Sequence, residues 1–241
     1  AYLIDWDGYY APKVVNALFD KGLRAKVNTA PFTLSGKSYD EGMILVPVQN
    51  QNHAPQDIHD LMEELATENH VTITGVETGL TEDGIDLGSP SFDPLRQPKV
   101  AMVVDGGASS YDAGEVWHLL DQRYHMPITM IEADDMGGAN LDRYNTLVMV
   151  SGYYGGISSS GVSNIKEFVQ NGGVLIAMEN AVNWAKSQGL AYFDRKSAES
   201  EDSKEQRPYN KISPDRGRSY IGGSIFETEL DLTHPLTFGY S

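Results

Sequence analysis

Three side chains in this sequence could together carry acid–base chemistry: Glu179, His234 and Asp105. Glu179 follows GVLIAM (173–178), a run that predicts a buried strand entering a sharp turn and then a helix. A residue at such a turn stands above the edge of a sheet, beside the backbone N–H groups of a helix N-terminus. The pattern places Met178 at the turn, and a thioether cannot attack a carbonyl. We therefore predict a degenerate nucleophile elbow, at which only carboxylates and His234 could act.

A glycine-rich turn, DGGASS (105–110), follows a second buried strand and opens a helix. Open α/β sheets bind ligands at such turns, and Gly106, Gly107 and Ser109 are the weak candidates for holding a ligand. The dinucleotide pattern G-x-G-x-x-G is absent, and Asp105 would repel an anion. A plain strand-to-helix turn is the favoured interpretation, and a small-molecule site is the alternative.

The histidines form no metal-binding pattern. H-E-x-x-H and H-x-x-E are both absent, and the nearest spacing is His118 with Asp121. We therefore expect no metal ligand and no cofactor in this chain. Other groups are expected to be structural, because paired carboxylates arise by chance in an acidic chain, serines suit helix caps, and tryptophans pack in cores. These groups are Asp112 with Glu115, Asp134 with Asp135, the serines Ser158, Ser159 and Ser160, and Trp6, Trp117 and Trp184.

Composition narrows the classes of partner. Asp and Glu number 34 against 18 Lys and Arg, which gives a formal net charge of −16. Nucleic acids and anionic membranes require a basic face, so neither is an expected partner. The absence of cysteine excludes disulfides, cysteine–zinc sites and a thiol nucleophile. The acidic surface favours neutral or basic ligands.

The elements that must position these residues fall into two α/β series. Residues 1–97 predict the order β-α-β-β-α-β, with a turn at GKSYDEG (36–42) and a Gly- and Pro-rich linker at 77–97. Residues 98–241 predict a doubly wound, flavodoxin-like parallel sheet with helices on both faces, one of them at 115–124 and another opening at Ser163. Residues 194–218 are charged and poor in apolar side chains, which predicts a mobile loop.

The strand, turn and helix at 173–190 resemble the elbow of class I glutamine amidotransferase-like domains, where the turn carries a cysteine nucleophile. Met178 stands at the matching position here, and the family's His-Pro-Glu has only an echo in His234-Pro235-Leu236. The resemblance implies the fold without the catalytic apparatus.

A wider resemblance covers nearly the whole chain. Five stretches resemble the region downstream of the catalytic domain in Bacteroidetes-type zinc carboxypeptidases of the carboxypeptidase A-like family. They are AYLIDWDGYYAPKVVNALFDKGLRAKV (1–27), KSYDEGMILVPVQNQ (37–51), GIDLGSPSFDPLRQPKVAMVVDGG (84–107), YDAGEVWHLLDQRY (111–124) and DLTHPLTFGY (231–240). The resemblance implies a secreted or periplasmic protein whose zinc and catalytic residues lie in an upstream peptidase domain. It also implies that both ends of this chain, including the C-terminus of its second domain, are cuts within a longer polypeptide.

The expected function is therefore a non-catalytic accessory region that supports its own upstream peptidase domain or binds a peptide or glycan substrate. Two alternatives remain open. One is a stand-alone hydrolase of amidotransferase fold that uses Glu179, His234 and Asp105. The other is a small-molecule or glycan-binding module at the DGGASS turn.

Overall fold

The computed structural model describes residues 1–194, 208–211, 217, 225 and 227–240. One compact unit comprises residues 1–192 together with 232–241, and a second comprises 193–231. Most of the predicted mobile loop at 194–218 lies outside the described residues. Within the described part of the chain, no helix is both long and apolar enough to cross a membrane.

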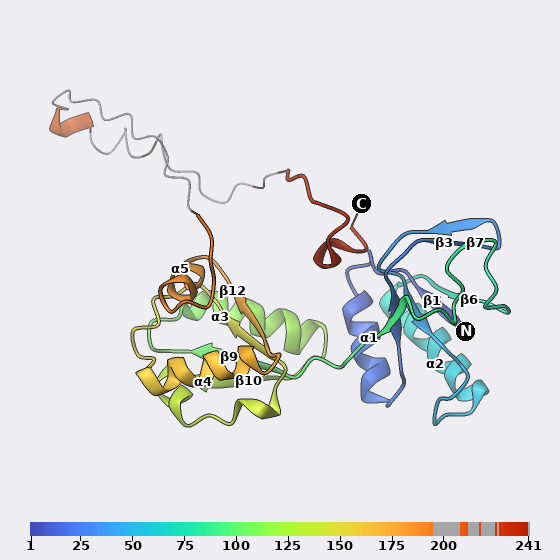
Figure 1. Ribbon diagram of the computed structural model, residues 1–241, viewed down its shortest axis with the longest axis horizontal. Helices are drawn as coiled ribbons and strands as arrows, with labels where there is room; N and C mark the ends of the chain where they lie inside the picture. Colours follow the sequence, from blue (N-terminus) through green and yellow to red (C-terminus); the bar gives the residue numbers. More distant parts are fainter. Residues whose placement is uncertain (195–207, 212–216, 218–224, 226, 241) are drawn as a thin grey trace. The chain divides into compact units, whose positions relative to one another are not determined.

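The first 97 residues form a five-stranded antiparallel sheet, sheet A, with the strand order β6-β1-β5-β2-β8 (Figure 1). Each strand is short. Their bounds are β1 (Tyr2–Ile4), β2 (Lys26–Asn28), β5 (Ile44–Val46), β6 (Ile73–Gly75) and β8 (Phe92–Pro94).

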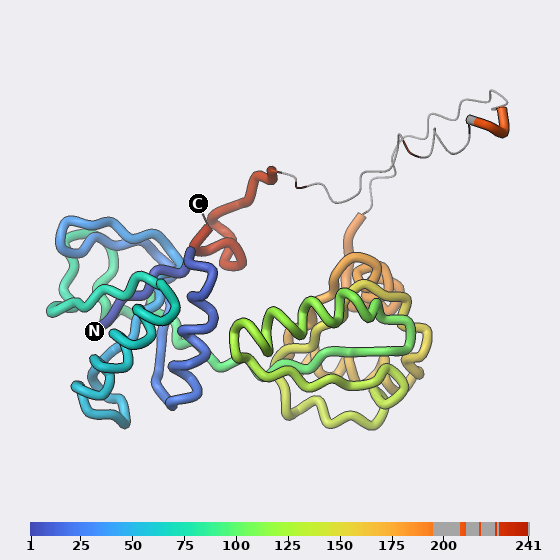
Figure 2. Tube along the Cα trace, turned by 180° about the vertical axis from the view of Figure 1, so that it is seen from behind, coloured from blue at the N-terminus to red at the C-terminus, as the bar shows by residue number. Residues whose placement is uncertain are grey.

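Two helices, α1 (Ala11–Asp20) and α2 (Pro55–Asn69), lie side by side and pack on one face of sheet A (Figure 2). Both begin with a proline in the first turn, where the missing N–H costs nothing. Their apolar residues recur at helical spacing, and Leu18, Ile58 and Met62 are almost fully buried against the sheet. Both helices confirm the sequence prediction.

A three-stranded sheet, sheet B, packs against the other face of sheet A. It consists of β3 (Phe32–Leu34), β4 (Lys37–Tyr39) and β7 (Asp83–Gly84), in the order β4-β3-β7. Phe32 stacks on Tyr39 with 4.9 Å between the ring centroids, and both contribute to the core between the sheets.

Two predictions for this region were wrong. The segment 36–42 was predicted as a turn, but it contains β4, and 77–97 was predicted as a linker, but it contains β7 and β8. These strands are two or three residues long, too short to show an alternating apolar pattern. β7 and β8 form by pairing with strands distant in the sequence, β3 and β2, whereas β4 forms a hairpin with the neighbouring β3.

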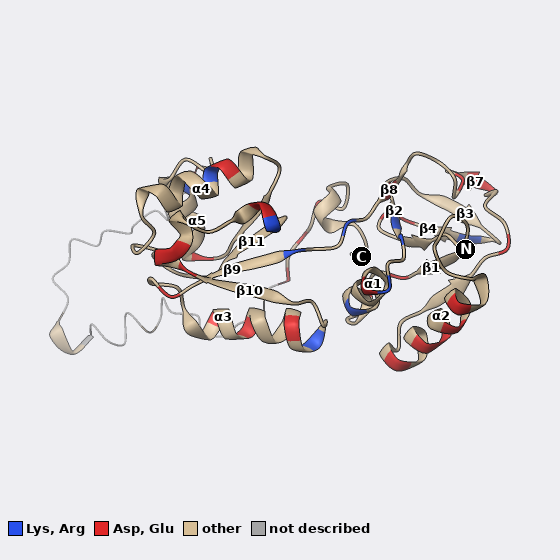
Figure 3. Ribbon diagram, turned by 90° about the horizontal axis from the view of Figure 1, so that it is seen from below, with Lys and Arg blue, Asp and Glu red and all other residues tan. Residues whose placement is uncertain are grey.

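The parallel sheet predicted after Gln97 is confirmed as sheet C, with helices on both faces. Its four strands have the order β10-β9-β11-β12. In Figure 3, α3 lies below the sheet and α4 and α5 lie above it. The bounds are β9 (Val100–Val104), α3 (Ser110–Trp117), β10 (Ile128–Glu132), β11 (Thr146–Met149), α4 (Ser159–Gln170), β12 (Val174–Ala177) and α5 (Asn180–Ser187).

Serine caps set the starts of two of these helices earlier than predicted. Ser109 Oγ accepts a hydrogen bond from the Asp112 N–H at 3.4 Å, so α3 begins at Ser110, before the predicted Glu115. Ser158 Oγ accepts from the Gly161 N–H at 3.2 Å, so α4 also begins before Ser163. The capping role predicted for the serine cluster is confirmed at Ser158.

Short helical turns complete the described structure. They are the π-helical turn η1 (His118–Arg123) and the 3₁₀ turns η2 (Ala133–Gly137), η3 (Leu141–Arg143), η4 (Tyr209–Lys211) and η5 (Pro235–Thr237). The residues around η5 were assigned to the second predicted domain, but they contact the N-terminal region. There the Gly239 N–H donates to Glu41 O at 3.1 Å, and Gly239 packs against Trp6.

Candidate functional site

The loops that follow the strands of sheet C meet at its carboxyl edge. The Ser109 N–H, after β9, donates to Ser151 O at 2.8 Å, and the Tyr153 N–H donates back to Gly107 O at 3.1 Å. Asn180 Nδ2, after β12, lies 3.4 Å from Ser151 Oγ. These bonds join three loops into one surface at the position where open α/β sheets bind ligands.

Three non-glycine residues in these loops have strained backbones. The φ angles are 59° at Asp105, 51° at Tyr154 and 48° at Glu179. Positive φ places the side chain of an L-residue against its own backbone, and each such residue costs about 1–3 kcal/mol. Strain of this kind collects where a loop must aim a side chain, so it marks this edge as a candidate site.

The sharp turn between β12 and α5 is present, and Glu179 is its strained residue. Its φ of 48° and ψ of −113° lie one position after Met178, which the sequence pattern had placed at the turn. Met178 packs against the apolar cluster beneath α3. Glu179 is exposed, and its carboxylate accepts no hydrogen bond from any residue in the described ranges. The turn therefore presents a free carboxylate.

The backbone donors at Gly106, Ala108 and Ser109 in the glycine-rich turn are already used. The Gly106 N–H donates to Asp105 Oδ1 at 2.8 Å, and the Ser109 N–H is bonded to Ser151. A side chain at Gly106 would overlap Ala133, and one at Gly152 would lie 2.7 Å from Gly107 O. These glycines permit close approach between loops, which favours the plain-turn interpretation over an anion cradle.

Several acidic residues follow the strands of sheet C in the sequence. They lie at the carboxyl edge because all four parallel strands end there (Figure 3). Lys99 instead precedes β9, which places it at the opposite edge, whereas Arg143 lines a small pocket together with Asp135. The acidic residues that follow the strands are Asp105, Asp112, Asp134, Asp135 and Glu179.

Two exposed tyrosines accompany these acids, and sequence analysis did not single them out. Tyr111 is 85% exposed at the start of α3, and Tyr153 is 80% exposed after β11. Their position after the strands of a parallel sheet was the available signal. Exposed aromatic faces can pack against ligands, so both belong to the candidate site.

A pocket of about 370 Å³ opens beside the acidic residues, between α3 and strands β9 and β10. Trp117, Ala113 and Met130 supply apolar walls, and Asp105 and Ser109 supply polar groups. An apolar pocket with a few polar groups is the usual form of a small-ligand site.

Tyr154 anchors the loop after β11 in the apolar core beside sheet C. It is 1% exposed, its ring lies 5.9 Å from that of the buried Trp184, and its hydroxyl donates to Val150 O at 2.7 Å. Burial raises the pKa of Tyr154, and the negative charge of Asp112 raises it further. Tyr154 is therefore a neutral structural support for the site.

The three residues proposed for acid–base chemistry have different surroundings. Asp105 and Glu179 both lie at the carboxyl edge of sheet C. His234 caps η5, where the Leu236 N–H donates to its Nδ1 at 3.2 Å, in the segment that contacts Glu41. Among the residues that the structure describes, no cluster of three or more His, Asp and Glu side chains could hold a metal ion.

Comparison with known proteins identifies no relative: no protein-family model, curated protein or solved structure matches the chain. The resemblance to zinc carboxypeptidases is thus a prediction from the sequence pattern, which none of these comparisons tests.

Proposed function

We propose that this chain is a non-catalytic accessory region of a secreted zinc carboxypeptidase, and that the carboxyl edge of sheet C binds a basic segment of a peptide. The observation that carries the binding site is the group of acidic side chains and exposed tyrosines at the edge where the strained loops meet. The proposed place of this chain in a zinc carboxypeptidase rests on the sequence resemblance.

The negative charge of the carboxyl edge and the pocket beside it favour a basic peptide over a glycan or another small molecule. Each exposed ion pair contributes only about 0.2–1 kcal/mol, but several act together along an extended ligand. The chain's net charge of −16 would also increase the rate of encounter with a cation. An apolar side chain next to a Lys or Arg of the ligand would fit the pocket lined by Trp117 and Met130.

We also propose that the second domain has a flavodoxin-like fold of the class I amidotransferase type. The strand order β10-β9-β11-β12 and the strained turn after β12 support it. Met178 supports a non-catalytic role, because it stands at the position that matches the family's cysteine and a thioether cannot attack a carbonyl.

Calorimetry with a short peptide carrying Lys, Arg and Leu tests the binding site. We expect binding that weakens as salt rises, and no binding of the matched peptide in which Glu replaces Lys and Arg. The double variant Asp105→Asn, Glu179→Gln should bind about three- to tenfold more weakly. Glu64→Gln, which removes an exposed acid on α2, should leave the affinity unchanged. Equal binding of both peptides would contradict the proposal.

Mass spectrometry of the same peptides tests the absence of catalysis. The peptides should remain intact with and without added zinc. Cleavage that is lost in Glu179→Gln would overturn the non-catalytic role and establish the second candidate, a hydrolase that uses the strained carboxylate. The peptidase relation has its own test, since the reading frame upstream of Ala1 should encode H-x-x-E followed by a later histidine.

A further inference from the structure

A second pocket, of about 780 Å³, lies at sheet A. Strands β2, β5 and β8 contribute to it, together with the loops that follow β5 and β6. Its volume is in the range of small-molecule sites in proteins, about 300–1,000 Å³.

The walls of this pocket are largely apolar. Val48, Val76 and Leu95 are half-buried residues that line the pocket, and Pro94 beside them is exposed. Leu45 and Leu87 lie behind them in the core between the sheets. The half-buried side chains would accommodate the hydrocarbon part of a ligand.

Lys26 is the exception on this apolar face. It pairs in register with Leu45 on one side and with Pro94 on the other, so its side chain shares their face of the sheet. The neighbouring Val27 packs into the opposite, helix-covered core. Lys26 is half-buried, and it lines the pocket beside these apolar side chains.

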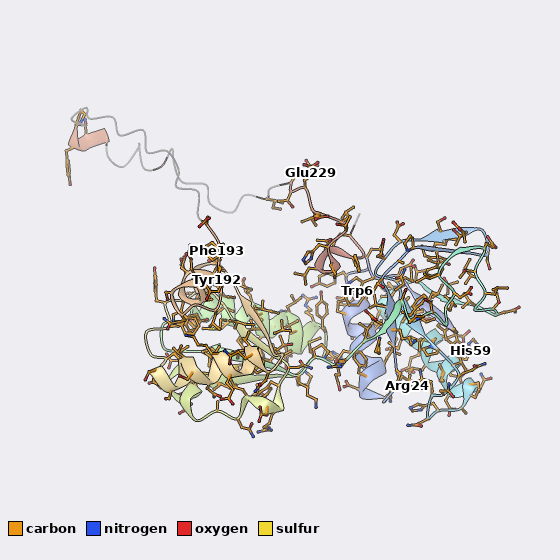
Figure 4. The ribbon with its side chains drawn as sticks, viewed as in Figure 1. Trp6, Arg24, His59, Tyr192, Phe193 and Glu229 are labelled. Carbon is orange, nitrogen blue, oxygen red and sulfur yellow. The ribbon has the colours of Figure 1, made fainter. Side chains whose placement is uncertain are left out.

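A second cation, Arg24, lines the same pocket from the turn between α1 and β2 (Figure 4). Among the described residues, neither Arg24 nor Lys26 forms an ion pair through its side chain. Glu77 also lines the pocket, but it is exposed and pairs with neither of them. Arg24 is exposed and Lys26 is half-buried, and the two positive charges at one pocket would attract an anion.

The rim that carries Arg24 is held in place by one side chain. Gln51 Oε1 accepts from the Arg24 N–H at 3.0 Å, and Gln51 Nε2 donates to Arg24 O at 2.9 Å and to Pro47 O at 2.8 Å. Gln51 thereby ties two segments that line the pocket. A fixed rim reduces the entropy lost when a ligand binds.

We propose that this pocket binds an organic carboxylate with an apolar body. The carboxylate contacts Lys26 and Arg24, and the body packs against Val48, Val76 and Leu95. Such a group can be the carboxyl end of a peptide or a free organic acid. The site is independent of the proposed peptide site on sheet C, which takes a cationic ligand.

Backbone amide NMR during titration tests the site with three probes. N-acetylphenylalanine represents a peptide end, phenylpropanoate represents a free acid, and N-acetylphenylalanine amide is the uncharged control. We expect shifts at residues lining the pocket for one or both carboxylates, with affinity at least about tenfold above that of the amide. The stronger carboxylate identifies the source of the ligand.

Two matched variants assign the effect to the pocket. Lys26→Met keeps the apolar stem and should weaken carboxylate binding about tenfold, whereas Lys21→Met, the same change at an exposed site, should not. Thermal unfolding of both variants checks that they remain folded.

Three results would overturn the proposal. The first is equal affinity for the carboxylate and the amide. The second is a folded Lys26→Met variant that binds as tightly as the parent chain. The third is the absence of shifts in the pocket up to about 20 mM carboxylate, a concentration at which even a weak site would be partly filled.

Discussion

Glu179 and Tyr154 show how single residues define the carboxyl edge of sheet C. Both have positive φ, but one side chain is exposed and the other is buried. Packing against Trp184 and a hydrogen bond to Val150 O offset the backbone strain at Tyr154. Glu179 has no such compensation among the described residues, which is why we assign its carboxylate to binding.

Tyr154→Phe removes the hydroxyl that donates to Val150 O at 2.7 Å. We expect a loss of about 1–2 kcal/mol in the free energy of unfolding, because a buried acceptor loses its donor. Urea denaturation at pH 7 measures this loss. Tyr192→Phe, at a 90% exposed tyrosine, is the control and should be neutral.

The same pair of variants has a pH signature. Burial raises the pKa of Tyr154 above its ordinary value of 10.0, so the unfolded state loses this proton before the folded state does. The stability from neutral Tyr154 is therefore complete below pH 10 and declines as pH rises further. Tyr154→Phe should flatten this alkaline decline. An unchanged slope above pH 10 would show that Tyr154 titrates normally in the folded protein.

At the scale of elements, sequence patterns predicted a helix or strand correctly where the element was long enough for its apolar residues to form a recognisable pattern. The apolar residues of α2 and the dense apolar run of β9 each predicted the element at its observed place. The turn after β12 was also found, but its strained residue was placed one position early, because a pattern of residue types does not determine φ.

Elements formed by distant pairing were not predictable in this way. β4, β7 and β8 have two or three residues each and flank Gly or Pro, so locally they resemble turns. β7 and β8 are stabilised by partners far along the chain, as for Phe92, which pairs with Asn28 and is 1% exposed. β4 pairs only with the adjacent β3, in a hairpin whose turn at Ser35 and Gly36 conceals the short strand. A linker and such a strand differ in burial, which sequence alone does not show.

Phe92→Ala tests whether the segment 77–97 is structural. We expect a loss of about 3–5 kcal/mol in the free energy of unfolding, because the substitution leaves a cavity against Phe32 in the core between sheets A and B. Leu80→Ala lies in the same segment at a 72% exposed side chain and should change stability by less than about 0.5 kcal/mol. Similar small effects for both in chemical denaturation would restore the linker interpretation.

For the whole molecule, the described sheets divide at Gln97. Sheets A and B take their strands from residues before it, and sheet C takes its strands from residues after it. The apolar clusters divide in the same way. Parallel strands bring their carboxyl ends to one edge of the sheet. The acidic residues that follow β9, β10 and β12 therefore lie at the same edge, although they are far apart in the sequence.

The division predicts that residues 98–192 fold without the rest of the chain. This fragment contains all four strands of sheet C, the helices on both of its faces and both of its apolar clusters. We expect cooperative thermal unfolding and dispersed amide NMR signals, because the native core is complete. The shorter fragment 98–145 lacks β11 and β12 and should show neither property. A non-cooperative transition in 98–192 would mean that its stability depends on residues outside it, and the boundary at Gln97 would then mark a change of sheet within one folding unit.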